Sequence, residues 1–305
     1  MWNLVRLALT IGAATLVAGC GAQNGPSALP PSIAAQSKAH RASGYSGDLL
    51  YVAEESDSVN VLIFTYPQGQ LYATVSNLYP AWGICSDTAG NVYVDAGLIY
   101  EFAHGSTVPT RTIQMPAPAF ATSCSVDATT GNLASIDIWP NAQGTPTTYA
   151  APFKPWTIAY DNRGNLWVDG TASDETVLLA ELPNGSSQFK TITLDKPTHW
   201  AGSVQWDGKY VAVLTNDKDA RIGHHQLIYR LRIKGQKGTV VAKTPLRQIE
   251  PGGFFLVQGA ALIGTLRGGD VGFWHYPTGG AEYKELTAGG AWGSAISVAP
   301  SRSRH

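Results

Sequence analysis

The chain is poor in charge and in the residues that most often build reactive sites. Only 14% of its 305 residues are charged, and it contains three cysteines, two methionines and seven histidines. Its formal net charge is −1. No basic stripe is available to neutralise phosphates, which argues against a nucleic-acid partner. No Cys-x-x-Cys or His-x-x-x-His spacing indicates a zinc or redox centre.

Signatures of common hydrolases are also missing. The chain has neither a Gly-x-Ser-x-Gly elbow nor a His-Glu-x-x-His sequence, so nothing supports a nucleophilic enzyme of the familiar kinds. We therefore assign no catalytic residue, and whether the protein is an enzyme stays open at this point.

Glycine, proline and aromatic residues are plentiful instead. The chain contains 33 Gly and 18 Pro, and 10% of its residues are aromatic. Many turn-forming residues combined with many strand-forming residues indicate an all-β protein with short strands.

The N-terminus has the features of an export signal. Trp2–Arg6 carries one positive charge, and Leu7–Val17 is an apolar segment of about 11 residues, too short to span a bilayer. The sequence Leu16-Val-Ala-Gly-Cys20 resembles the bacterial lipobox, in which the cysteine becomes the acylated N-terminus of the mature protein. The resemblance implies a lipoprotein signal peptide over residues 1–19 and acyl chains such as palmitate on Cys20. An ordinary signal peptide that happens to contain a cysteine is the alternative.

The next segment, residues 20–44, is rich in Gly, Ala, Ser, Pro and Gln. It has too few large apolar side chains to offset the entropy of ordering, so we predict a flexible tether. The expected location is the bacterial cell envelope, outside the cytoplasm, with the membrane as a partner through Cys20. The globular part is expected over residues 45–300, followed by a tail at 301–305, and we expect a monomer.

From Asp48 onward a short phrase recurs with a period of roughly 40 residues. It is clearest at Pro80-Ala-Trp-Gly-Ile-Cys-Ser-Asp87, followed by Gly90-Asn-Val-Tyr-Val-Asp95. It recurs at Pro155-Trp-Thr-Ile-Ala-Tyr-Asp161, followed by Gly164-Asn-Leu-Trp-Val-Asp169. Such a period indicates a stacked or closed array, because no single unit can bury its own apolar face.

Alignment on the Gly-Asn turn yields six units with about four strand-like runs each. The units are Asp48–Asp87, Gly90–Asp127, the short Gly131–Asp161, Gly164–Asp207, Gly208–Gln258 and Gly259–Pro300. We therefore predict an all-β, six-bladed β-propeller of four-stranded antiparallel blades. In the first unit, Gly83–Ser86 is predicted to be the closing run. Since the chain ends in an inner-type strand, Gly293–Ala299, this strand is predicted to complete the first blade and remove its exposed edge.

The repeated phrase, followed by strands such as Ile99-Tyr-Glu-Phe-Ala-His-Gly105, resembles the NHL-type repeats of propellers over residues 48–300. NHL-type repeats occur in enzymes, in extracellular sensor domains and in binding scaffolds. The resemblance therefore implies the fold, and the activity has to be argued from the site.

The position before each inner strand is aromatic in every unit. These residues are Trp82, Phe120, Trp156, Trp200, Phe254 and Trp292. One interpretation is structural, with the rings wedged between blades. The other is an aromatic-lined mouth that stacks on sugars or encloses an apolar or cationic ligand. His199 precedes Trp200 and is expected to face the same mouth.

Polar residues follow the second strands and are expected on the same face. They are Glu54, Asp95, Asp137, Asp169, Asn216 and Asp270, with Glu55, Asp217 and Arg267 beside them. Asp95 and Asp169 are candidate ligand-binding residues, although Asp after a strand often caps a turn. We predict no cofactor, but converging oxygens would suit Ca²⁺ or another divalent ion.

Two functions follow. The first is a tethered binding or scaffold protein that recognises a glycan, small molecule or protein through its aromatic-lined face. The alternative is a metal-dependent enzyme that resembles six-bladed lactonases or streptogramin lyases, which hold a divalent ion at the channel mouth. Its candidate ligands would be Glu54, Asp95, Asp169, Asn216 and His199. Stoichiometric metal in purified protein would favour the enzyme.

Cys85 and Cys124 occupy corresponding positions in neighbouring units. They could form a disulfide between adjacent units or remain two buried thiols, and the sequence leaves both possibilities open.

Overall fold

The protein is described from a computed structural model. The structure describes residues 45–300 apart from gaps at 55–60, 79–80, 117–121, 136, 197, 217–225 and 252. The predicted signal peptide and tether, Cys20 and Phe120 therefore lie outside the described residues. Among the residues that are described, no helix is long and apolar enough to cross a membrane.

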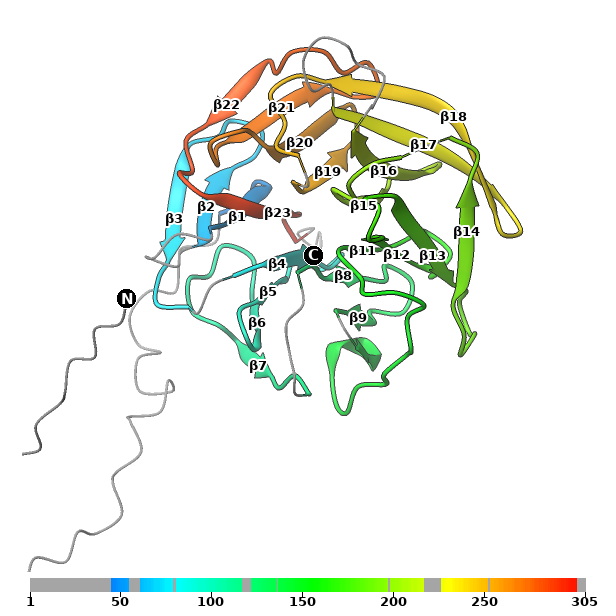
Figure 1. The fold of residues 1–305 in the computed structure, drawn as a ribbon. Coiled ribbons are helices and arrows are strands. Elements are labelled where there is room, and N and C mark those ends of the chain that lie inside the picture. Colours follow the sequence, from blue (N-terminus) through cyan, green and yellow to red (C-terminus); the bar gives the residue numbers. More distant parts are fainter. Residues whose placement is uncertain are drawn as a thin grey trace, which may run out of the picture. The chain divides into compact units, whose positions relative to one another are not determined.

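The described chain is built of strands that form a β-propeller-like ring of small, mainly antiparallel sheets (Figure 1). The first sheet has the order β23-β1-β2-β3, made of Ala291–Ser297, Leu49–Glu54, Val61–Thr65 and Leu71–Val75. The second has the order β4-β5-β6-β7, made of Gly83–Ser86, Val92–Asp95, Ile99–Phe102 and Arg111–Ile113. The third has the order β10-β9-β8, made of Ile138–Trp139, Leu133–Ala134 and Ser125–Val126, and a 3₁₀ turn, η2, follows at Pro140–Ala142.

An eight-stranded sheet and a final four-stranded sheet complete the ring. One half of the larger sheet has the order β11-β12-β13-β14, made of Ile158–Tyr160, Leu166–Thr171, Val177–Leu182 and Lys190–Leu194. Its other half has the order β18-β17-β16-β15, made of Lys237–Leu246, Gln226–Lys234, Val211–Asn216 and Val204–Trp206. The final sheet has the order β19-β20-β21-β22, made of Phe255–Gln258, Ala261–Thr265, Val271–His275 and Lys284–Leu286. The strands β4, β8, β11, β15, β19 and β23 surround the centre of the ring (Figure 1).

The C-terminal strand closes the first sheet, as the repeat phase predicts. β23 pairs antiparallel with β1, from Leu49 opposite Ser297 to Ala53 opposite Gly293. All six residues of β1 are buried, so the edge that this strand would otherwise expose is covered. The assignment of Gly83–Ser86 to the first unit is wrong. This strand, β4, pairs with β5 and is therefore the inner strand of the second sheet.

Two regions depart from the predicted set of separate four-stranded blades. The third sheet has only three strands of two residues each, because the chain that follows it is interrupted by prolines, which cannot donate to a ladder. The fourth and fifth units are joined into one sheet by two parallel pairs, Thr193 with Lys237 and Leu194 with Gly238. β17 and β18 have nine and ten residues, long enough to reach β14.

The apolar core lies between neighbouring sheets. Tyr51 and Ile63 from the first sheet are buried in one cluster with Val94 and Phe102 from the second. Since each sheet buries one face against the next, the repeat unit depends on its neighbours for its core.

The question of the two cysteines is decided by the structure. Cys85 in β4 and Cys124 next to β8 form a disulfide with a Cα–Cα distance of 5.5 Å. The bond joins the second sheet to the short third sheet and closes a loop across 39 residues.

Candidate functional site

The aromatic position before the inner strand is set by one repeated hydrogen bond. The backbone N–H of Trp156 donates to the carbonyl of Asp169 at 2.7 Å, and that of Trp82 donates to the carbonyl of Asp95 at 3.0 Å. In each case the first residue precedes the inner strand and the second lies in the strand beside it, Asp95 as the last residue of β5 and Asp169 within β12. This bond places the indole and the aspartate at the same end of their sheet.

Of the five aromatic residues at this position that the structure describes, three line a common cavity. The cavity has a volume of about 910 Å³, and Trp156, Trp200 and Trp292 are among its walls. Trp156 and Trp200 precede β11 and β15 of the eight-stranded sheet, and Trp292 belongs to β23 of the first sheet, so the cavity is formed by more than one sheet. Its volume is within the range of small-molecule sites.

The other aromatic residues have different surroundings. Phe254 is buried, and its ring centroid lies 5.7 Å from that of Trp292. Trp156 packs edge-on against Trp292, with centroids 6.3 Å apart and planes at 74°. Trp82 is half-buried and is not among the cavity's lining residues. The repeated aromatic position therefore serves packing in some units and borders open space in others.

Trp200 is the aromatic residue least explained by packing. It is 47% exposed, one of the most exposed large hydrophobic residues among those described. Its φ is +56°, a left-handed conformation that bulky residues rarely adopt. Its N–H donates to the carbonyl of Glu175 at 2.9 Å, which holds the loop in place. Core packing does not account for a strained, exposed tryptophan at a cavity.

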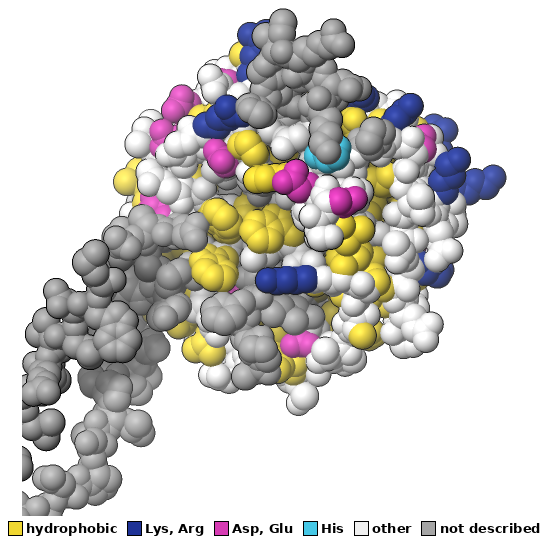
Figure 2. Space-filling view, viewed as in Figure 1, with side chains coloured by type: hydrophobic (Ala, Val, Ile, Leu, Met, Phe, Trp, Pro, Cys, Tyr) yellow, Lys and Arg dark blue, Asp and Glu magenta, His cyan; other side chains and the backbone are white. Residues whose placement is uncertain are grey.

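Few polar side chains line the cavity. Glu250 is half-buried, and Thr171 and Thr265 contribute hydroxyl groups. Figure 2 shows hydrophobic side chains gathered around the centre of one face of the ring, with acidic, basic and histidine side chains around them. The cavity can therefore offer flat apolar surface for stacking and a small number of hydrogen-bonding groups.

One rim of the cavity is made of two glycine pairs. Gly268-Gly269 and Gly289-Gly290 line it, and the N–H of Gly290 donates to the carbonyl of Gly269 at 3.0 Å. A Cβ on Gly269 would lie 2.9 Å from the backbone of Gly290. The pairs therefore let two loops approach closely, and no side chain projects from this part of the rim. The repeat pattern does not single out these glycines or Glu250, although two Gly-Gly pairs about 20 residues apart are visible in the sequence.

Asp95 is buried at the end of β5, and Asp169 is buried within β12. Burial raises the pKa of Asp169 to about 7, despite hydrogen bonds from the Thr157 hydroxyl and N–H, both 2.7 Å from Oδ1. Its Oδ2 has no hydrogen-bond partner among the described residues. Burial also raises the pKa of Asp95 to about 7, against the effect of a hydrogen bond from Ser135. Neither residue is among those lining the cavity, and only Asp169 is bonded, through its backbone carbonyl, to a lining residue, Trp156.

The candidate metal ligands are dispersed in their contacts. His199 is half-buried, its N–H donates to the Thr215 hydroxyl at 2.9 Å, and its carbonyl accepts from the Asn216 N–H. Glu54 is buried at the end of β1. Within the described ranges, no three His, Cys, Asp or Glu side chains come together in a way that could hold a metal ion. The metal-dependent alternative stays a prediction that rests on sequence only.

The recurring aspartate of the Asp-x-x-Gly-Asn phrase has a different task from Asp95 and Asp169. Oδ1 of Asp161 accepts from the N–H groups of Arg163 and Asn165, at 2.8 and 3.0 Å. Its Oδ2 accepts from the Asn165 side chain and from the Trp167 indole, at 2.9 and 3.1 Å. Asp87 makes the corresponding set of bonds in the second sheet. This aspartate caps the turn between the two strands, which explains why it repeats.

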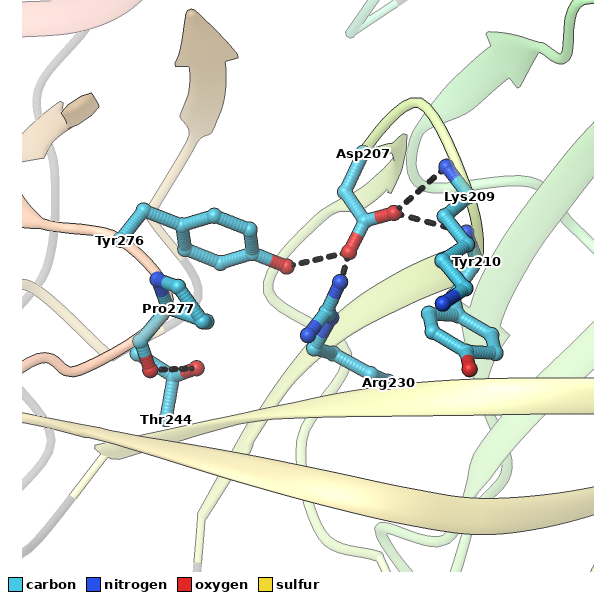
Figure 3. Close-up of polar contacts among 7 residues, drawn as sticks. All are labelled: Asp207, Lys209, Tyr210, Arg230, Thr244, Tyr276 and Pro277. Carbon is cyan, nitrogen blue, oxygen red and sulfur yellow. Dashed lines mark hydrogen bonds and ion pairs between the residues drawn. The ribbon is translucent and has the colours of Figure 1, made fainter. Parts of the chain in front are cut away.

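Asp207, at the same turn of the β15–β16 hairpin, is the centre of a larger network (Figure 3). Its Oδ2 accepts from Arg230 Nε at 2.6 Å and from the Tyr276 hydroxyl at 2.7 Å. Its Oδ1 accepts from the N–H groups of Lys209 and Tyr210. Burial acts to raise the pKa of Asp207, but these hydrogen bonds outweigh it and hold the pKa below its usual value. The network ties the eight-stranded sheet to the final sheet.

No model of a protein family and no curated protein matches the chain. Among solved structures with a similar fold is a protein of unknown function from Bacteroides caccae, with a TM-score of 0.57 and 12% sequence identity. The match covers 82% of this chain and 99% of that one. At this identity the likeness concerns the fold alone, and it agrees with the β-propeller-like ring.

Proposed function

We propose that the protein is a tethered binding protein that holds a small ligand with a flat apolar face, most simply a sugar unit of a glycan, in the tryptophan-lined cavity. The observation that carries the proposal is the cavity of about 910 Å³ with Trp156, Trp200 and Trp292 in its walls. Indole rings stack on the apolar faces of sugars, and Glu250, Thr171 and Thr265 are available for hydroxyl groups.

We further propose that the ring consists of six NHL-type blades. The eight-stranded sheet supports this count, since its halves β11–β14 and β15–β18 each repeat the four-strand order of the first sheet. Only two residue pairs join β14 to β18. The three-stranded sheet would be the blade of the shortest repeat.

The cellular location is part of the same proposal. The lipobox-like sequence ending at Cys20 and the tether that follows favour a lipid-anchored protein of the bacterial envelope. Replacement of Cys20 by serine should release the protein from the membrane fraction of a bacterial host. Unchanged membrane association of Cys20→Ser would contradict the lipid anchor without affecting the binding proposal.

Binding is tested with tryptophan variants on a glycan array. Trp156→Ala combined with Trp200→Ala should lose at least tenfold in affinity for any glycan that the wild type binds, because two stacking surfaces are removed. Tyr283→Ala is the matched control, since Tyr283 is 49% exposed and is not among the residues lining the cavity.

Stability is measured on the same variants by urea unfolding. If the double variant unfolds while Tyr283→Ala does not, the rings are part of the core and the binding proposal fails. Equal glycan affinity of the wild type and the double variant would also refute it.

A further inference from the structure

A second cavity lies at the opposite end of the same strands. Asp161 follows β11, whose other end is entered from Trp156, and Asp207 follows β15, whose other end is entered from Ala201. Between these two turns is a cavity of about 410 Å³, bordered by both halves of the eight-stranded sheet. It shares no lining residue with the tryptophan-lined cavity.

Four cationic side chains line this second cavity: Arg163, Lys190, Lys209 and Arg232. All four are exposed. The salt bridges found among the described residues are Arg111 with Glu101 and Arg230 with Asp207. None of the four cations makes a salt bridge in that part of the chain, although Glu181 lies opposite Lys190 in the β13–β14 pairing. In a protein with a formal net charge of −1, this is a local concentration of positive charge.

The two carboxylates of the cavity do not cancel that charge. Asp161 and Glu181 line it, so four cations and two acids leave a formal charge of +2. The oxygens of Asp161 are occupied by the hydrogen bonds of its turn. Glu181 is half-buried, and burial raises its pKa even though Lys190 acts to lower it.

An aromatic residue sits among the cations. Tyr210 lines the cavity, and a hydrogen bond from Arg232, followed by the charges of Lys209 and Arg232, lowers its pKa. Its ring is held in place by Arg230, whose guanidinium carbon lies 4.9 Å from the ring centroid and which is itself fixed by Asp207 (Figure 3). The cations of the cavity are therefore grouped around an aromatic ring, that of Tyr210, whose position is fixed.

The fold does not require these cations, as the corresponding cavity one repeat earlier shows. That cavity lies between the third sheet and β11–β14 and is bordered by Asp127, Tyr160 and Leu166. These correspond in the repeat to Asp161, Trp206 and Val211. It has a volume of about 230 Å³, and neither lysine nor arginine is among its lining residues. The cationic lining is therefore not repeated in the neighbouring cavity.

We propose that the second cavity binds a phosphate or sulfate ester group carried on a sugar-sized body. Guanidinium groups pair with such oxyanions through two parallel hydrogen bonds, and lysines add point charge. A volume of about 410 Å³ accommodates one sugar unit. The Tyr210 ring, with Lys209 Nζ 5.3 Å and the Arg230 guanidinium carbon 4.9 Å from its centroid, keeps cationic groups together at this cavity. The proposal does not depend on binding at the tryptophan-lined cavity.

The experiment measures binding of pyrophosphate and of glucose 6-phosphate to the full-length protein by calorimetry at low salt. Arg163→Gln combined with Arg232→Gln should weaken both at least tenfold. Arg247→Gln combined with Lys196→Gln is the matched control: it removes the same charge from exposed side chains that line neither cavity and should change affinity less than twofold. Thermal unfolding of both variants checks that the fold is retained.

Vesicles that contain an anionic phospholipid distinguish a soluble ester from a lipid headgroup. Binding of glucose 6-phosphate without vesicle binding supports a soluble ligand, and vesicle binding lost only in the cavity variant supports a headgroup. Equal losses in the two double variants, or no binding by the wild type of either anion or of the vesicles, would overturn the proposal. Trp200→Ala should leave anion binding unchanged, so the proposal for the second cavity is tested independently of the proposal for the tryptophan-lined cavity.

Discussion

The aspartates at the two ends of the inner hairpins are held in opposite ways. Asp207, at the turn end, accepts four hydrogen bonds, one of them from a guanidinium, and its pKa lies below the usual value. Asp169, at the mouth end, is fully buried with one oxygen unpartnered among the described residues, and its pKa is raised to about 7. One residue type thus stabilises the fold at one end and is strained by burial at the other.

This difference between the two ends distinguishes aspartates that recur because they stabilise turns from the residues of the mouth end. The turn aspartates repeat because every hairpin needs its turn capped, and their bonds are satisfied locally. The mouth end retains features that stability alone does not favour: buried acids, a left-handed tryptophan and an open cavity. Exposure and backbone conformation, which differ between units, are therefore better guides to the site than the recurrence of a residue type.

Removal of the Asp207 carboxylate should be the most damaging change. Asp207→Ala leaves Arg230 without its partner and the Tyr276 hydroxyl without an acceptor, so we expect a loss of about 3–5 kcal/mol in the free energy of unfolding. Urea unfolding measures it. Asp195→Ala is the control, because Asp195 is exposed and accepts from one N–H, that of Val240. Similar losses in the free energy of unfolding of both variants would contradict the stabilising role of the Asp207 network.

The contribution of Asp169 to the free energy of unfolding should depend on pH in the sense opposite to that of Asp207, since the pKa of Asp169 is raised and that of Asp207 is lowered. Because its folded pKa is raised, its ionisation in the unfolded chain costs stability as the pH rises from about 4 to about 7. Below pH 4 this cost is absent. Asp169→Asn stays neutral and should gain stability over the wild type across that window, by up to about 4 kcal/mol. Urea unfolding from pH 4 to 8 tests this, and parallel pH profiles of the two proteins would refute it.

A solvent-accessible turn aspartate should matter less than Asp207. Asp87→Ala removes the acceptor for the N–H groups of Ala89 and Asn91, and we expect a loss of about 1–2 kcal/mol. Asp174→Ala serves as the comparison, since Asp174 is exposed and accepts from the Thr176 N–H. If thermal unfolding shows no difference between the two variants, the capping role of the repeated aspartate is overstated.

Trp200→Asn should have the smallest effect on stability and a large effect on binding. Asparagine tolerates the left-handed backbone better than tryptophan does, so the free energy of unfolding should change by no more than about 1 kcal/mol. Glycan affinity should fall at least tenfold with the loss of the stacking face. A strongly destabilised variant would place Trp200 with the structural aromatic residues such as Phe254.

Several features of the fold were predictable because they depend on local pattern. The repeat phase predicts that the C-terminal strand completes the first sheet, and the β1–β23 pairing confirms it. The junction of β14 with β18 was not predictable, since it depends on how far the β17–β18 hairpin extends in space. The glycine rim, Glu250 and the cationic cavity come from units whose alignment in sequence does not show which side chains meet.

The sequence by itself determined the repeat, the all-β class, the ring closure and the aromatic position before each inner strand, because these follow from periodicity and turn chemistry. Only the tertiary structure decided which aromatic residues are exposed and that Cys85 and Cys124 pair. It also decided that the cations of two units surround one cavity. The physical reason is that the burial of a side chain, the close approach of two groups and the local electric field all depend on residues from several neighbouring units. A repeat read one unit at a time contains no information on its neighbours.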